Sequence, residues 1–234
     1  MSLSKTAHIL FISFLLIGIY IGVCVHTALF APVQVTQFLF SESGPFESFS
    51  AWLWYLLAVL CVLNTELKLK TRIFTALGAA LLGLREMDFH KRLFDDSFIK
   101  TNFYRSAEIP FMDKLLGFIL LLAIIFVFFN LAKIFVQAIR QFKSNPNIAY
   151  LFIALTVLCG GLSKLLDRTS STLNEDFNIK LMQHTEVIIM TIEEGVEMLL
   201  PILLVVAVMT YRKVLTSPIK TSLCWDQARQ SGAD

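Results

Sequence analysis

Charged residues are scarce in this chain of 234 residues: 16% are Asp, Glu, Lys or Arg, against about 25% in soluble domains. Hydrophobic residues make up 56% and are gathered in long uninterrupted blocks, with the charges between them. This distribution excludes a soluble globular enzyme and a disordered chain, and it is typical of a polytopic membrane protein. The net charge of +2 gives no reason to expect a nucleic-acid partner.

Cysteine is also scarce, and the common catalytic motifs are absent. The chain has four cysteines, of which three lie in apolar blocks and one near the C-terminus: Cys24, Cys61, Cys159 and Cys224. Without a Cys-x-x-Cys pair, neither a zinc knuckle nor a disulfide framework is supported. The sequence also lacks His-x-x-x-His, His-Glu-x-x-His, Glu-x-x-His and Gly-x-Ser-x-Gly. No motif therefore names a family or a reaction.

Six apolar blocks are long enough, or nearly long enough, to cross a bilayer as helices, which takes about 20 residues. They occupy about residues 7–33, 49–63, 73–89, 115–139, 148–166 and 187–211. The first block exceeds the apolar core of a signal peptide and is interpreted as a retained helix. We therefore predict an all-α fold, a bundle of six transmembrane helices forming one domain over residues 1–216, followed by a cytoplasmic tail at 217–234.

The basic residues indicate the orientation of this bundle. With six spans both termini share one side of the membrane, and 11 of the 20 Lys and Arg residues fall on that side. This bias favours cytoplasmic N and C termini, and we expect a bacterial inner (plasma) membrane protein. Carboxylates are distributed far more unevenly, since of the 18 only Glu66, Asp226 and Asp234 lie on the cytoplasmic side. The outer side is therefore the chemically rich one.

Two long outer segments connect the blocks on that side. The segment after the third block mixes charges with aromatic residues, and Phe94 and Phe98 are spaced i,i+4. This pattern predicts either an interfacial helix over about 91–104 or a plain amphipathic surface loop. The second outer segment, 167–183, is rich in Ser, Thr and Asn and is predicted to be a loop.

The third block ends with a carboxylate and an imidazole at helical spacing. On a helix, Glu86 and His90 are i,i+4 and share one face, while Arg85 and Asp88 point elsewhere. Such a pair can present two ligands to one metal ion, or orient a histidine base.

The sixth block carries acidic residues inside its apolar stretch. Glu186, Glu193 and Glu197 are spaced i, i+7 and i+11 and fall on one helical face. Glu197 is expected more than one turn inside the apolar layer, where a carboxylate must be paired, metal-bound or protonated. Pro201 cannot donate a hydrogen bond to the carbonyl of Glu197, and interrupted helices of this kind often mark binding sites.

These features predict a polar site at the outer ends of the third, fifth and sixth blocks. The candidate catalytic groups are Glu86, His90, Glu193 and Glu197. The candidates for holding an anionic head group are Arg85, Lys164 and Arg168. The candidate ligands of a divalent metal are His90, His184, Glu186 and Glu197. The competing interpretation is that these charges form structural ion pairs, such as Arg85 with Glu194 or Lys164 with Glu193.

Three classes of function are compatible with such a site. The favoured one is a membrane-embedded enzyme, with or without a divalent metal, that acts on a lipid-like substrate. The second is a transporter in which Glu193 and Glu197 carry a proton or cation. It ranks lower because residues 202–209 are wholly apolar. The third is a non-catalytic subunit that docks a protein partner within the membrane. Membrane lipids are expected partners in every case.

Overall fold

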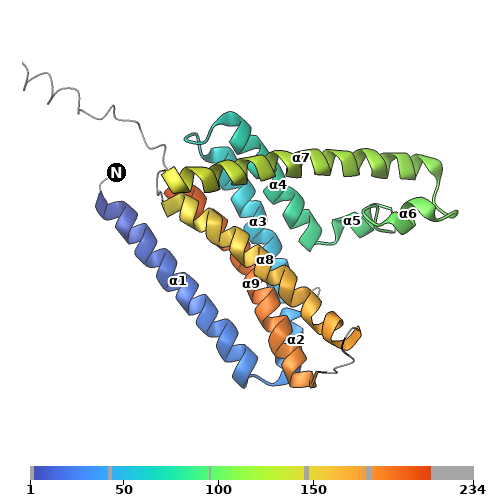
Figure 1. The fold of residues 1–234 in the computed structure, drawn as a ribbon, viewed down its shortest axis with the longest axis horizontal. Helices are drawn as coiled ribbons and strands as arrows, with labels where there is room; N and C mark the ends of the chain where they lie inside the picture. The colour runs from blue at the N-terminus through green and yellow to red at the C-terminus, as the bar shows by residue number, and fades with distance from the viewer. Residues whose placement is uncertain are drawn as a thin grey trace, which may run out of the picture.

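The computed structural model describes residues 3–41, 44–94, 96–144, 148–175, 177 and 181–211. These residues form an all-α fold, as predicted (Figure 1). The predicted tail at 217–234 lies outside the described residues. In chain order the helices are α1 (Leu3–Phe30), α2 (Val33–Phe40), α3 (Pro45–Leu63), α4 (Leu69–Glu86), α5 (Phe89–Arg92), α6 (Thr101–Arg105), α7 (Phe111–Ser144), α8 (Ile148–Glu175) and α9 (Gln183–Thr210).

Helix α9 is the centre of the packing. It contacts α8 along most of its length, and it also packs against α3, α1 and α2. Helix α4 packs on α3 and on α7. Because α3 packs on both α4 and α9, it lies between these two helices. Figure 1 shows α1 along one side of this group and α7 diverging from α8 at a wide angle. The short helices α5 and α6 lie near the N-terminal end of α7, which is the end away from α8.

The long helices alternate in direction, as a multi-pass protein requires. The junction of α7 with α8 and the C-terminal end of α9 lie at one end of the molecule (Figure 1). The C-terminal end of α1, helix α2 and the start of α9 lie at the opposite end. Short connections between antiparallel neighbours produce this arrangement.

Four segments of the described chain are long and apolar enough to cross a membrane. They are Leu10–Phe30, Val33–Leu63, Phe111–Gln141 and Ile148–Thr169. Helices α4 and α9 fall outside this set although both are long. Four charged residues lie in α4 and four glutamates in α9, which raises the cost of placing either helix in hydrocarbon. The composition indicates a multi-pass membrane protein.

Proline interrupts the first predicted span. Helix α1 ends at Phe30, whereas the apolar block was expected to continue as one helix to residue 33. Pro32 lacks the backbone N–H that a helix interior needs and disfavours the α conformation at Ala31. The chain therefore restarts as α2, with Pro32 at its N-cap.

One prediction for the outer segments requires correction. The Ser/Thr/Asn-rich stretch at 168–174 was predicted to be a loop, but α8 continues through it to Glu175. The Thr169 hydroxyl donates a hydrogen bond to the Leu165 carbonyl oxygen at 2.7 Å, so this side chain is satisfied within the helix. The other outer segment, for which either an interfacial helix over 91–104 or a surface loop was predicted, contains the two short helices α5 and α6.

Aromatic packing holds together the segment between α4 and α7. Phe103 is fully buried, and the Phe94 ring contacts Phe98 edge-on and Phe103 at a tilt, with centroid distances of 5.9 and 5.5 Å. The rings contact each other, and Phe103 also packs closely on Gly117 of α7. A Cβ added to Gly117 would lie 3.0 Å from the Phe103 ring. The i,i+4 pair of phenylalanines therefore belongs to a small core, not to a membrane-facing surface.

Two apolar clusters enclose the inner half of α9. Leu57 and Cys61 of α3 pack with Ala79 of α4 and Leu204 of α9. On the other side of α9, Phe152 of α8 packs with Leu203, Val206 and Ala207. Burial of apolar side chains against each other fixes the spacing of the helices here.

Candidate functional site

Glu197 lies in the middle of α9 and is held by two donors from α8. The Ser163 hydroxyl donates a hydrogen bond to Glu197 Oε1 at 2.8 Å. Lys164 Nζ lies 3.3 Å from the same oxygen. Glu197 is largely buried, with 19% of its side chain exposed. The sequence predicts that Glu197 is paired, metal-bound or protonated, and in the structure two residues one position apart on the neighbouring helix α8 contact it.

The Lys164 ammonium joins Glu197 to a second carboxylate. Its Nζ lies 3.1 Å from Asp167 Oδ2, one turn further along α8. Glu193, one turn before Glu197 on α9, interacts electrostatically with Asp167, Glu197 and Lys164. The competing interpretation from the sequence was an ion pair between Lys164 and Glu193. In the structure Lys164 forms its salt bridges with Glu197 and Asp167.

Helices α3 and α4 bring further carboxyl groups toward the same place. Glu86, the last residue of α4, is half-buried and interacts electrostatically with Glu197, Glu47 and Lys164. Glu194 of α9 interacts with Glu197, Glu193, Glu47 and Glu86. We refer to the whole set as the acidic cluster: Glu47, Glu86, Asp167, Glu193, Glu194 and Glu197, with Lys164.

The acidic cluster extends from helix ends toward the middle of the bundle. Glu47 lies in the first turn of α3 and Glu86 at the end of α4, both near the predicted outer side. Tyr20 is the middle residue of the candidate span Leu10–Phe30, and its hydroxyl contacts Gly195 of α9. Glu194 precedes Gly195 and Glu197 follows it by two residues, so this end of the cluster lies level with the middle of that candidate span. Charged groups in the middle of a membrane span are costly and commonly functional.

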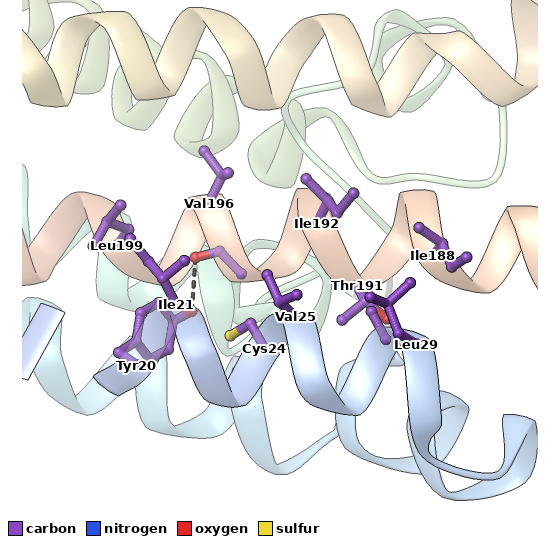
Figure 2. A pocket seen from close by; sticks show the side chains of 12 residues that line it. Tyr20, Ile21, Cys24, Val25, Leu29, Ile188, Thr191, Ile192, Val196 and Leu199 are labelled. Atoms are coloured by element: carbon purple, nitrogen blue, oxygen red, sulfur yellow. Dashed lines mark hydrogen bonds between the residues drawn. The ribbon is translucent and has the colours of Figure 1, made fainter. Parts of the chain in front are cut away.

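A cavity of about 280 Å³ lies between α1 and α9, beside the same turn of α9. Figure 2 shows the aliphatic side chains of Val25, Ile192 and Val196 around it. The Tyr20 hydroxyl donates a hydrogen bond to the Gly195 carbonyl oxygen at 2.7 Å. Tyr20 also interacts electrostatically with Glu194. One turn of α9 therefore presents an apolar cavity on one side and carboxyl groups on the other.

The two predicted histidines lie on α5 and at the start of α9. Helix α4 ends at Glu86 and Asp88 adopts a left-handed conformation with φ of 51°. His90 therefore belongs to α5, and the single helical face predicted for Glu86 and His90 is not formed. The side chain of His90 lies outside the described residues. His184 is exposed in the first turn of α9.

The remaining predicted residues fall at the edge of the cluster or away from it. Glu186 and Arg168 are exposed, while Arg85 lines a different cavity, between α4 and α7. Among the described residues, no group of three or more His, Cys, Asp and Glu side chains is arranged to hold a metal ion. The proposed metal ligands thus stay a prediction.

Sequence reasoning missed three contributors to this site. Ser163 is fully buried on α8, and Glu47 lies on α3, far from α9 in the sequence. Neither carries a signal in the sequence, because only the packing of α8 and α3 on α9 brings them near. Tyr20 had a signal, since it places a hydroxyl inside an apolar block and a polar group there must find a partner.

Comparison with known proteins identifies no relative of this chain. Neither a protein-family model, nor a curated protein, nor a solved structure matches this chain.

Proposed function

We propose that this chain is a six-span protein of the bacterial inner membrane with both termini in the cytoplasm. We further propose that its acidic cluster is the acid–base site of a membrane-embedded enzyme that acts on a lipid-like substrate. The observation that carries the proposal is the position of Gly195. Its carbonyl meets Tyr20 at the apolar cavity, and the neighbouring Glu194 and the nearby Glu197 belong to the acidic cluster.

The arrangement of donors supports a division of roles within the cluster. Ser163 and Lys164 fix the carboxyl group of Glu197. Glu193 and Glu194 are crowded against it without an ammonium partner of their own in the described salt bridges. Neighbouring carboxyl groups in different environments are a common means of giving one site both an acid and a base. We assign proton transfer to Glu193 and Glu194, and positioning to Ser163 and Lys164.

The cavity supports a substrate with a hydrocarbon part. It is walled by the candidate span Leu10–Phe30, so it adjoins the lipid phase. An aliphatic chain lying there would bring the adjoining polar part of the molecule toward Tyr20 and Glu194. Transport is less well supported, because the described residues around the inner half of α9 form apolar clusters.

The test is a search for a lipid product. The purified full-length protein is placed in vesicles made from the total lipids of the expression host, and the lipids are compared by mass spectrometry before and after incubation. We expect a conversion that falls by about 100-fold or more in Glu194→Gln, the loss typical of removing a general acid or base.

The matched control is Glu108→Gln, an exposed glutamate before α7 that lies outside the acidic cluster. It should convert lipid at the wild-type rate. An unchanged lipid composition with wild-type protein, or equal conversion by Glu194→Gln, would refute the enzyme proposal. In that case a subunit that docks a partner through its charged face becomes the better account.

A further inference from the structure

A second and larger cavity, of about 340 Å³, lies between α4 and α7. Leu81 of α4 and Ala123 of α7 are on its walls, and Phe89 and Leu93 of the following segment cover its end. Arg85 is the one polar side chain among the residues that line it. Its volume falls within the range of about 300–1,000 Å³ that is usual for small-molecule sites.

Two close contacts of α7, one with α4 and one with α6, bound this cavity at its two ends. Near the middle of the helices, Gly78 of α4 lies so close to Leu131 of α7 that an added Cβ would overlap the leucine side chain. Near the start of α7, Gly117 is in tight contact with the Phe103 ring of α6. The α7 residues that line the cavity, from Leu120 to Phe128, lie between these two contacts. The space between the helices is therefore built into the packing.

The cavity opens where membrane lipid is expected. Its α7 wall belongs to the candidate span Phe111–Gln141, and Ala123 and Leu120 on that wall are exposed. Since water has few polar partners on such a surface, hydrocarbon is the natural occupant. A single acyl chain matches both the shape and the chemistry of the groove.

Arg85 supplies charge at one end of this apolar groove. It lies one residue from the end of α4 and is exposed. It interacts electrostatically with the neighbouring Glu86, and within the described part of the chain no salt bridge or side-chain hydrogen bond holds it. The adjacent α5 carries a further exposed basic residue, Arg92. A guanidinium at the boundary of an apolar layer favours an anionic partner, and phosphate oxygens fit its geometry.

We propose that the groove between α4 and α7 binds one anionic phospholipid of the surrounding bilayer, with an acyl chain along Leu81 and Ala123 and the phosphate on Arg85. The groove is lined by α4 and α7, whereas the groups assigned to proton transfer, Glu193 and Glu194, lie on α9 beyond α3. Lipid binding in the groove therefore does not depend on the enzymatic role proposed for those two glutamates.

The experiment measures which lipids stay bound. Full-length protein is reconstituted in nanodiscs that contain equal amounts of phosphatidylglycerol and phosphatidylethanolamine, and retained lipids are counted by native mass spectrometry. The variants are Arg85→Gln, which removes the charge, and Ala123→Trp, which fills the groove. The matched controls are Arg105→Gln, an exposed arginine of α6, and Ala132→Trp, an exposed alanine of α7 that does not line the groove.

We expect wild type and both controls to retain one phosphatidylglycerol in preference to phosphatidylethanolamine. Arg85→Gln should reduce this preference by about tenfold, the loss expected when a charge-assisted contact is removed. Ala123→Trp should abolish retention.

Equal retention of the two lipids by wild type would overturn the proposal, as would retention in Ala123→Trp at the wild-type level. Because Arg85 is exposed, its glutamine variant is expected to fold, so the charge test holds even if the tryptophan variant does not fold.

Discussion

Ser163 and Ser50 are two buried serines that differ in their hydrogen bonding. The Ser163 hydroxyl donates to Glu197, whereas the Ser50 hydroxyl has no partner among the described residues. Replacing Ser163 by alanine should lower the free energy of unfolding by about 1 kcal/mol, in the range measured for hydrogen bonds inside membrane proteins. Unfolding by sodium dodecyl sulfate in mixed micelles, followed by circular dichroism, gives this quantity.

Ser50→Ala is the control for the effect of removing a buried hydroxyl. Because its oxygen is buried at 4% exposure without a partner, the alanine variant should be as stable as wild type or more stable. Equal losses in the two variants would show that the contact between Ser163 and Glu197 contributes nothing specific.

The bond between Lys164 and Glu197 leads to a prediction about metal. An ammonium 3.3 Å from the carboxylate already supplies positive charge where a divalent ion would bind. We therefore expect elemental analysis of purified protein to give the same metal content for wild type and Glu197→Ala. A stoichiometric divalent metal in wild type that is lost in both Glu197→Ala and His90→Ala would instead establish the metal site predicted from the sequence.

At the scale of residues, the sequence identified the groups that are costly to bury but not what they contact. Glu197 stood out because a carboxylate within an apolar block must have a partner. That partner comes from α8, and which residues of α8 face α9 depends on how the two helices are rotated and aligned. The competing interpretation paired Lys164 with Glu193, which lies one turn away from Glu197, the glutamate that Lys164 contacts.

Helix α4 approaches its neighbours through glycine, and this leads to a prediction about α4 as an element. A Cβ on Gly83 would lie 2.9 Å from the Tyr55 ring and 3.2 Å from the Ala51 carbonyl oxygen, both on α3. Since α3 must move to make room, Gly83→Ala should lower the free energy of unfolding by about 1–3 kcal/mol. The same detergent titration measures the change.

Gly161→Ala on α8 serves as the comparison. A Cβ there meets nothing within 4 Å, so the substitution removes helical flexibility without a clash. Its stability should be unchanged or raised by up to about 1 kcal/mol. Equal effects of the two substitutions would mean that α4 does not pack as closely on α3 as the structure has it.

The existence of the long helices could be predicted at the scale of elements, but their ends could not. Long apolar blocks indicate helices whatever their neighbours are. Helix α1 ends before Pro32 because proline lacks a backbone N–H and disfavours the α conformation of the preceding residue. The length of the apolar block does not indicate this. Asp88 ends α4 in a left-handed turn, which separates Glu86 from His90. Helix α8 continues through residues of modest helix propensity because it remains packed on α9.

For the whole molecule, the structure has four candidate spans where the sequence predicts six. The difference consists of α4 and α9, which contribute Glu86, Glu193, Glu194 and Glu197 to the acidic cluster. Within this cluster the partners of Glu197 are residues of α8. Charged groups that find partners within the bundle lower the free-energy cost of placing these helices in a membrane. Candidate spans selected by length and hydropathy do not take this into account.

The six-span arrangement predicts on which side of the membrane exposed positions lie. Glu66 precedes α4 and Glu108 follows α6, and both are exposed. If α4 crosses the membrane, these two positions lie on opposite sides. In a background with Cys224 replaced by serine, a membrane-impermeant maleimide should label Glu108→Cys in intact spheroplasts. Glu66→Cys should be labelled only after the membrane is permeabilised.

Helix α9 is tested in the same way by positions on either side of it. Phe177, between α8 and α9, is exposed, and Cys224 lies beyond the end of α9. A cysteine at position 177 should react in intact spheroplasts, while the native Cys224 should require permeabilisation. Because the native Cys24 and Cys61 are buried, they should not contribute to the labelling. If positions 66 and 108 are labelled together in intact spheroplasts, α4 does not cross and the six-span topology is wrong.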